Sequence, residues 1–186
     1  MLFSKWTVYQ AAALTGLIGL AVLAEFYSLD IGNALASGAI SSMLIVLTFI
    51  LLSTSLIHLF FVFHSKKSER FLSHPLWNKM NVLSGLVLVF SVVVFISAGM
   101  FTPLNDWITD GRWILYGILY LFLFLYSLFV LSVVHKVKQR SAKETKIEIS
   151  FGATVVSLCV LLFLLIPKQP PVETILWLEP EAVLSD

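Results

Sequence analysis

The sequence predicts an all-α fold, a polytopic membrane helix bundle with five transmembrane helices, and three observations lead to that prediction. Hydrophobic residues make up 59% of the chain and charged residues only 12%, whereas a soluble domain has about 25% charged residues. The apolar residues form long continuous runs without the strict alternation of a barrel strand. The remaining charges gather between these runs. Lipid is the solvent in which such a chain is stable, and its length suits one domain.

Five runs contain the roughly 20 mostly apolar residues that a spanning helix needs. They cover residues 6–29, 34–64, 82–101, 113–135 and 149–166. The first run exceeds the apolar core of a signal peptide, which has about 7–15 residues, so we expect a retained helix. Prolines and an Asp-Gly pair mark the ends of the later runs. We expect a transmembrane domain over residues 1–168 and a short extracytoplasmic tail over residues 169–186.

The distribution of positive charge predicts the direction in which the chain crosses the membrane. The segments on one side carry Lys5, then Lys66, Lys67, Arg70 and Lys79, then Lys136, Lys138, Arg140, Lys143 and Lys146. The opposite side carries only Arg112 and Lys168 among seven acidic residues. Because basic loops stay in the cytoplasm, the N-terminus is expected inside and the C-terminus outside. The expected location is a bacterial cytoplasmic membrane.

Small residues at four-residue spacing predict where helices pack closely. Ala34, Gly38 and Ser42 recur in this way on the second run, as do Ala12 and Gly16 on the first. Lipid supplies no hydrophobic drive for helices to associate, so interfaces depend on close backbone approach at small residues. These stripes indicate either packing within the bundle or the interface of a homo-oligomer.

Three histidines near the basic segments are candidate cofactor ligands. His64 ends the second run and His135 ends the fourth, so their imidazoles are expected at one depth, as a haem b held between two helices requires. His58 lies within the apolar run, about 9 Å from His64 along the helix and on another face. The alternative is a hydrated margin for His64 and His135, favoured by the helix C-termini, and a hydrogen-bonded structural role for His58.

One segment resembles part of a known family. The stretch NVLSGLVLVFSVVVFISAG, Asn81 to Gly99, resembles the helix of small membrane cytochromes b in which His-x-x-x-Gly is followed by a second glycine. The resemblance covers one helix and implies a haem-binding bundle. Asn81 stands where the family has its ligand histidine, so this position supplies no ligand.

Acidic residues suggest a second kind of site. Glu25 lies within the first apolar run, where a carboxylate needs a partner or a water path. Asp106 and Asp110 are four residues apart in the short segment between the third and fourth runs, and on a helical turn they would share a face and could bind a hard cation. The three residues indicate either an ion pathway or acidic groups left outside by the charge bias.

The fourth run carries an aromatic stripe at helical spacing, Trp113, Tyr116 and Tyr120. Such a stripe is typical of helix packing with an interfacial aromatic belt, and it would also suit the wall of a quinone or lipid pocket.

The sequence carries none of the common catalytic motifs, with no Walker A, G-x-S-x-G or H-E-x-x-H pattern. Its single cysteine, Cys159, excludes a disulfide within the chain, and nothing favours nucleic-acid binding. Our first interpretation is therefore a non-enzymatic accessory, assembly or immunity-type subunit without a cofactor, acting through helix packing with a protein partner. The alternatives are a haem b- or quinone-linked electron-transfer subunit, and a small cation or solute transporter.

Overall fold

The computed structural model describes residues 5–27, 40–68, 71–72, 74–101, 112–138 and 140–165. These residues form five helices, each long and apolar enough to span a membrane, and no strand occurs among them. The helices are α1 (Lys5–Phe26), α3 (Ile40–Lys67), α4 (Trp77–Phe101), α6 (Trp113–Val137) and α7 (Lys143–Leu165). The prediction of an all-helical chain with five such helices is confirmed.

The helices differ from the predicted runs mainly at their polar ends. Helix α4 begins at Trp77, five residues before the predicted run, and α7 begins at Lys143, six residues before it. Helix α3 continues past His64 to Lys67. A helix is held by backbone hydrogen bonds along its length, so it can add a polar turn beyond the apolar run that predicts it. Lys146, predicted in a loop, consequently lies in the first turns of α7 and is buried.

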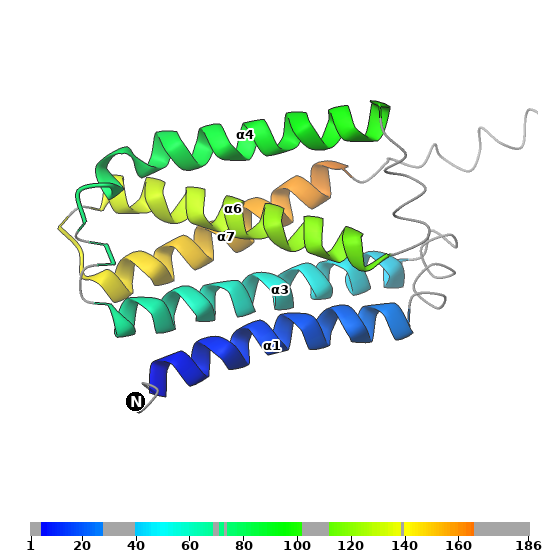
Figure 1. Ribbon diagram of the computed structural model, residues 1–186, viewed down its shortest axis with the longest axis horizontal. Coiled ribbons are helices and arrows are strands. Elements are labelled where there is room, and N and C mark those ends of the chain that lie inside the picture. The colour runs from blue at the N-terminus through cyan, green and yellow to red at the C-terminus, as the bar shows by residue number, and fades with distance from the viewer. Residues whose placement is uncertain are drawn as a thin grey trace, which may run out of the picture.

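Two helices form the centre of the bundle (Figure 1). Helix α3 contacts α1, α6 and α7, and α6 contacts α1, α3, α4 and α7. Among the described helices α4 contacts α6 alone, and Figure 1 shows it at the upper edge of the bundle, with α1 at the lower edge. The arrangement leaves α4 the most peripheral element.

The core combines large apolar residues with fully buried hydroxyls. The apolar cluster comprises Ile57, Phe61, Leu72, Trp77, Leu123, Leu131, Ile147 and Leu158. Ser53 and Thr54 of α3, Ser127 and Ser132 of α6, and Ser150 and Thr154 of α7 are fully buried. Small side chains let helix axes approach closely. The outer surface carries many exposed valines, leucines and phenylalanines, which suits contact with lipid.

The positive charges gather at one end of the bundle. There α3 and α6 end and α1, α4 and α7 begin, as Figure 1 shows around the label N. The described helices bring to this end Lys5, Lys66, Lys67, Lys79, Lys136 and Lys143. We call it the basic end. The other end, near Phe26 and Trp113, is called the opposite end.

Candidate functional site

All three candidate histidines lie in the half of the bundle nearest the basic end, but each has its own surroundings. His64 sits in the last turn of α3, between a polar and an aromatic contact. The Gln10 amide Nε2 lies 3.0 Å from its Nδ1, and the Phe71 ring stands edge-on at 4.7 Å between ring centroids. With Gln10 as the donor, Nδ1 accepts and the ring proton is on Nε2. Helix α1 thus fixes one face of this imidazole.

His135, near the end of α6, packs against Trp77 of α4 at 5.6 Å between centroids. Its Nδ1 is buried and has no hydrogen-bond partner in the described part of the chain. Trp77 contacts Phe71 at 5.2 Å, and Phe71 contacts His64. A continuous series of rings, His64–Phe71–Trp77–His135, therefore crosses the basic end.

This ring series bears on the haem interpretation. A haem iron held by His64 and His135 needs both imidazoles directed at one metal atom. In the observed arrangement the two imidazoles are linked through contacts with the Phe71 and Trp77 rings. The electron-transfer interpretation remains a prediction, and a Soret band lost in His64→Ala or His135→Ala would support it.

His58 is the most deeply buried of the three, with 4% of its surface exposed. Its Nδ1 lies 3.2 Å from the Thr54 carbonyl oxygen one turn earlier, and its Nε2 lies 3.5 Å from the Ser150 hydroxyl of α7. The Phe151 ring covers it at 5.0 Å. These contacts give the imidazole a place between α3 and α7, as the structural interpretation of His58 expects.

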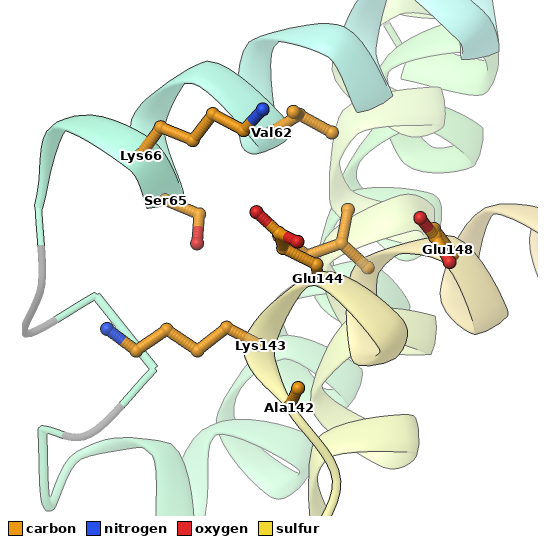
Figure 2. Close-up of a pocket in the computed structure, with 8 residues that line it drawn as sticks. Val62, Ser65, Lys66, Ala142, Lys143, Glu144 and Glu148 are labelled. Atoms are coloured by element: carbon orange, nitrogen blue, oxygen red, sulfur yellow. The ribbon is translucent and has the colours of Figure 1, made fainter.

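A polar groove opens between α3 and α7 at the basic end. It encloses about 480 Å³ and is bordered by Ser65, Lys66, Lys143, Glu144 and Glu148. Figure 2 shows the Glu144 carboxylate to the right of Ser65, with the Lys143 ammonium directed away from it. Val62, Ile147 and Glu148 also border a narrower apolar slot of about 320 Å³ that reaches His58. The slot beside the histidine and the polar groove thus share three of the residues that border them.

The predicted acidic residue Glu25 and the predicted aromatic stripe come together at the opposite end. A groove of about 500 Å³ between α1 and α6 is bordered by Glu25 together with Trp113, Tyr116 and Tyr120. The Tyr116 hydroxyl donates to a Glu25 carboxylate oxygen at 3.4 Å. The Tyr120 hydroxyl donates to the Leu17 carbonyl oxygen at 2.9 Å. Two sequence features that were predicted separately therefore belong to one site.

Several predicted site residues lie outside the described residues. These are Asp106, Asp110, Ala34 and Gly38, whereas Ser42 belongs to α3 without a described side chain. The ion-pathway interpretation therefore keeps only Glu25 as a residue with described surroundings, and it remains a prediction. Within the described ranges no three histidine, cysteine or acidic side chains form a group that could hold a metal ion.

The structure also brings forward residues that the sequence interpretation missed. Gln10 is buried inside α1 and meets His64, and it could have been noticed as a polar residue in the first apolar run. Phe71 and Ser150 gave no comparable signal, because a phenylalanine in a short connection and a serine in an apolar run are common. Their contacts depend on which helices become neighbours.

Comparisons with protein-family models, with curated proteins and with solved structures give no match to this chain.

Proposed function

We propose that this chain is a non-enzymatic accessory, assembly or immunity-type subunit of a bacterial cytoplasmic membrane, and that it acts by packing α4 against a transmembrane helix of a different membrane protein. In this proposal the five helices cross the bilayer and the basic end faces the cytoplasm, in keeping with the positive-inside rule. The partner helix packs against the side of α4 that the described helices leave uncovered.

The observation that carries the proposal is the one-sided attachment of α4. Only 6% of its apolar segment is buried, against 22–28% for the other four helices, and α6 is its one contact among the described helices. On the side of α4 that faces α6, the two helices pack closely. The Ser84 and Ser132 hydroxyls lie 3.1 Å apart, and Phe95 packs edge-on against Phe122. No other described helix covers the rest of the α4 circumference, which leaves room there for a second neighbour.

The open side of α4 has the spacing of a helix-packing seam. Exposed large residues recur at alternating intervals of four and three positions along it: Val82, Leu86, Val89, Val93, Ile96 and Met100. A mean repeat of about 3.5 residues keeps one stripe facing a partner helix, and left-handed packing of this kind is the commonest in membrane bundles. This chain could therefore accept a partner helix along the whole of α4.

A polar group at one end of this seam also favours a protein partner. A shallow apolar groove along α4 begins at Asn81 and continues past Gly85. The Asn81 Oδ1 is buried without a hydrogen-bond partner among the described residues. The Asn81 side chain borders the groove, and a polar group on a partner helix could bond to its amide, which a lipid chain cannot do.

The test is site-specific photocrosslinking in native membranes, with a benzophenone amino acid at Val89 or Val93 on the seam. The controls are Val156 and Val160 on α7, because the exposed fractions match, 63% with 63% and 54% with 53%. We expect both seam positions to give an adduct with the same second protein and both α7 positions to give none. The paired change Leu86→Trp and Val93→Trp should abolish the adduct from Val89 while the chain remains folded.

Two results would overturn the proposal. Lipid adducts alone from all four positions would make the seam an ordinary lipid-facing surface. Adducts between two copies of this chain would replace the different partner with a homo-oligomer.

A further inference from the structure

The groove between α1 and α6 at the opposite end has the features of a binding site for an amphiphile. Its floor and walls are mostly apolar, and Glu25 is the one acidic residue among the described residues that border it. Neither α4 nor the seam along it borders this groove. An inference about the groove therefore requires that the helices cross a bilayer, but it does not depend on the partner proposed for α4.

The chemistry of the groove changes along its depth. Glu25 lies one residue before the end of α1 and Trp113 begins α6, so both lie at the mouth. Ile18 and Tyr120 also border the groove, seven residues further from the mouth on each helix, which corresponds to about 10 Å at 1.5 Å per residue. The charge is at the mouth and the apolar space lies below it.

The polar contacts at the mouth leave the Glu25 carboxylate able to accept more hydrogen bonds. Its hydrogen bond from Tyr116 is long, at 3.4 Å, and a carboxylate offers about four lone-pair sites. The Tyr116 and Trp113 rings border the same space. A carboxylate beside aromatic faces is suited to an ammonium group, which pairs with the charge and is attracted to the rings.

Gly117 makes room for a hydrocarbon chain in the groove. It borders the groove, and no heavy atom outside its own helix lies within 4 Å of the position that a Cβ would occupy. A larger side chain there would begin in open space and extend into the groove. The glycine therefore offers a way to close the space while the bundle keeps its packing.

We propose that this groove binds one phospholipid of the surrounding bilayer whose headgroup carries a primary ammonium, as ethanolamine does. The ammonium lies at Glu25, against the Tyr116 and Trp113 rings, and one acyl chain lies over Gly117. The headgroup phosphate is directed toward Arg112, which is exposed immediately before α6. Charge complementarity and the order of polar and apolar surfaces together favour this zwitterionic lipid over an anionic lipid that has no ammonium group.

The experiment measures lipid binding to the full chain in detergent by native mass spectrometry, with dioleoyl phosphatidylethanolamine and dioleoyl phosphatidylglycerol as probes. We expect one ethanolamine lipid per chain, bound at least about tenfold more tightly than the glycerol lipid, because only its ammonium can donate charge-assisted hydrogen bonds to Glu25. Glu25→Gln should remove this preference. Free phosphoethanolamine, which has no acyl chains, should not displace the lipid at equal concentration.

Gly117→Leu should weaken binding of both lipids by filling the groove. The matched control is Gly152→Leu on α7, because a Cβ on Gly152 would also have no neighbouring atom within 4 Å and Gly152 does not border this groove. If Glu25→Gln does not yield folded protein, the Gly117 and Gly152 pair carries the test. Equal affinities for the two lipids in the unmodified chain, or displacement by phosphoethanolamine, would overturn the proposal, as would equal effects of the two glycine substitutions.

Discussion

The polar side chains inside the bundle are mostly hydroxyls, and many donate to a carbonyl oxygen of their own helix. Ser53 donates to Phe49 at 2.8 Å and Thr154 to Ser150 at 2.7 Å. Such bonds satisfy the hydroxyl without fixing a neighbouring helix. The side chains that specify the arrangement of the helices are therefore the few that bond between helices, and they include Gln10 and Tyr126.

Replacing only one partner of the contact between Gln10 and His64 should destabilise the protein. Gln10→Leu leaves the His64 Nδ1 without its donor, and we expect a loss of about 1–3 kcal/mol. The double change Gln10→Leu with His64→Leu removes both polar groups and should cost less than either single change. Thermal unfolding in detergent, run as a double-mutant cycle, measures this, and additive losses would show that the two side chains act independently.

The Tyr126 hydroxyl donates to the Ser157 hydroxyl at 2.7 Å and links α6 to α7. Tyr126→Phe should lower the unfolding free energy by about 0.6 kcal/mol, the mean for hydrogen bonds between membrane helices. Ser157 keeps its bonds to the Ala153 and Thr154 carbonyl oxygens, so the loss stays small. Tyr9→Phe is the control, since a phenylalanine retains the ring contacts with Trp6 and Phe63, and an equal loss there would contradict the assignment.

At the level of the helices, close packing depends on where the glycines lie. A Cβ on Gly85 of α4 would lie 3.1 Å from the Phe129 ring of α6, whereas a Cβ on Gly99 of the same helix would meet no atom within 4 Å. Gly16 of α1 has a similar contact with Leu56 of α3, so this residue of the predicted small-residue stripe lies at an interface, whereas Ala12 is exposed. Spacing alone cannot separate Gly85 from Gly99, because both lie in the same apolar run.

Gly85→Val should loosen the contact between α4 and α6. The added methyl groups would overlap the Phe129 ring, and overpacking typically costs about 1–3 kcal/mol. Gly99→Val is the matched control on the same helix, and we expect little change. Thermal unfolding of the two variants in the same detergent makes the comparison, and equal melting temperatures would contradict the packing described for Gly85.

The apolar pattern of the sequence predicts the ends of the helices less well than their centres. The apolar runs predict the middle of each helix well, because hydrocarbon-length stretches have few other structures open to them. The polar turns Trp77–Lys79 and Lys143–Glu148 carry no such constraint, and the structure adds them to α4 and α7. The basic end is consequently built from residues that the sequence interpretation left in loops.

For the molecule as a whole, the number of helices and the gathering of positive charge at one end follow from the sequence alone. The sites do not, because a groove needs two helices and the sequence does not state which helices are neighbours. Glu25 and Tyr116 are 91 positions apart and become neighbours only when α1 meets α6. His64 and His135 were expected to share a depth, and both lie near the basic end, but the rings of Phe71 and Trp77 connecting them gave no signal in the sequence.

The gathering of charge predicts how the chain lies in a membrane. Lys5, Lys66, Lys79 and Lys136 come from four different helices and lie at the same end, and an excess of lysine and arginine keeps such an end in the cytoplasm. A fluorescent-protein reporter inserted after Gln139 should therefore be fluorescent, because that position lies in the basic segment between α6 and α7. A phosphatase that is active only outside the cytoplasm should be active when fused after Asp186, because an odd number of crossings separates the two termini. The exchanged fusions serve as controls, and activity of the phosphatase at residue 139 with fluorescence at residue 186 would reverse the orientation.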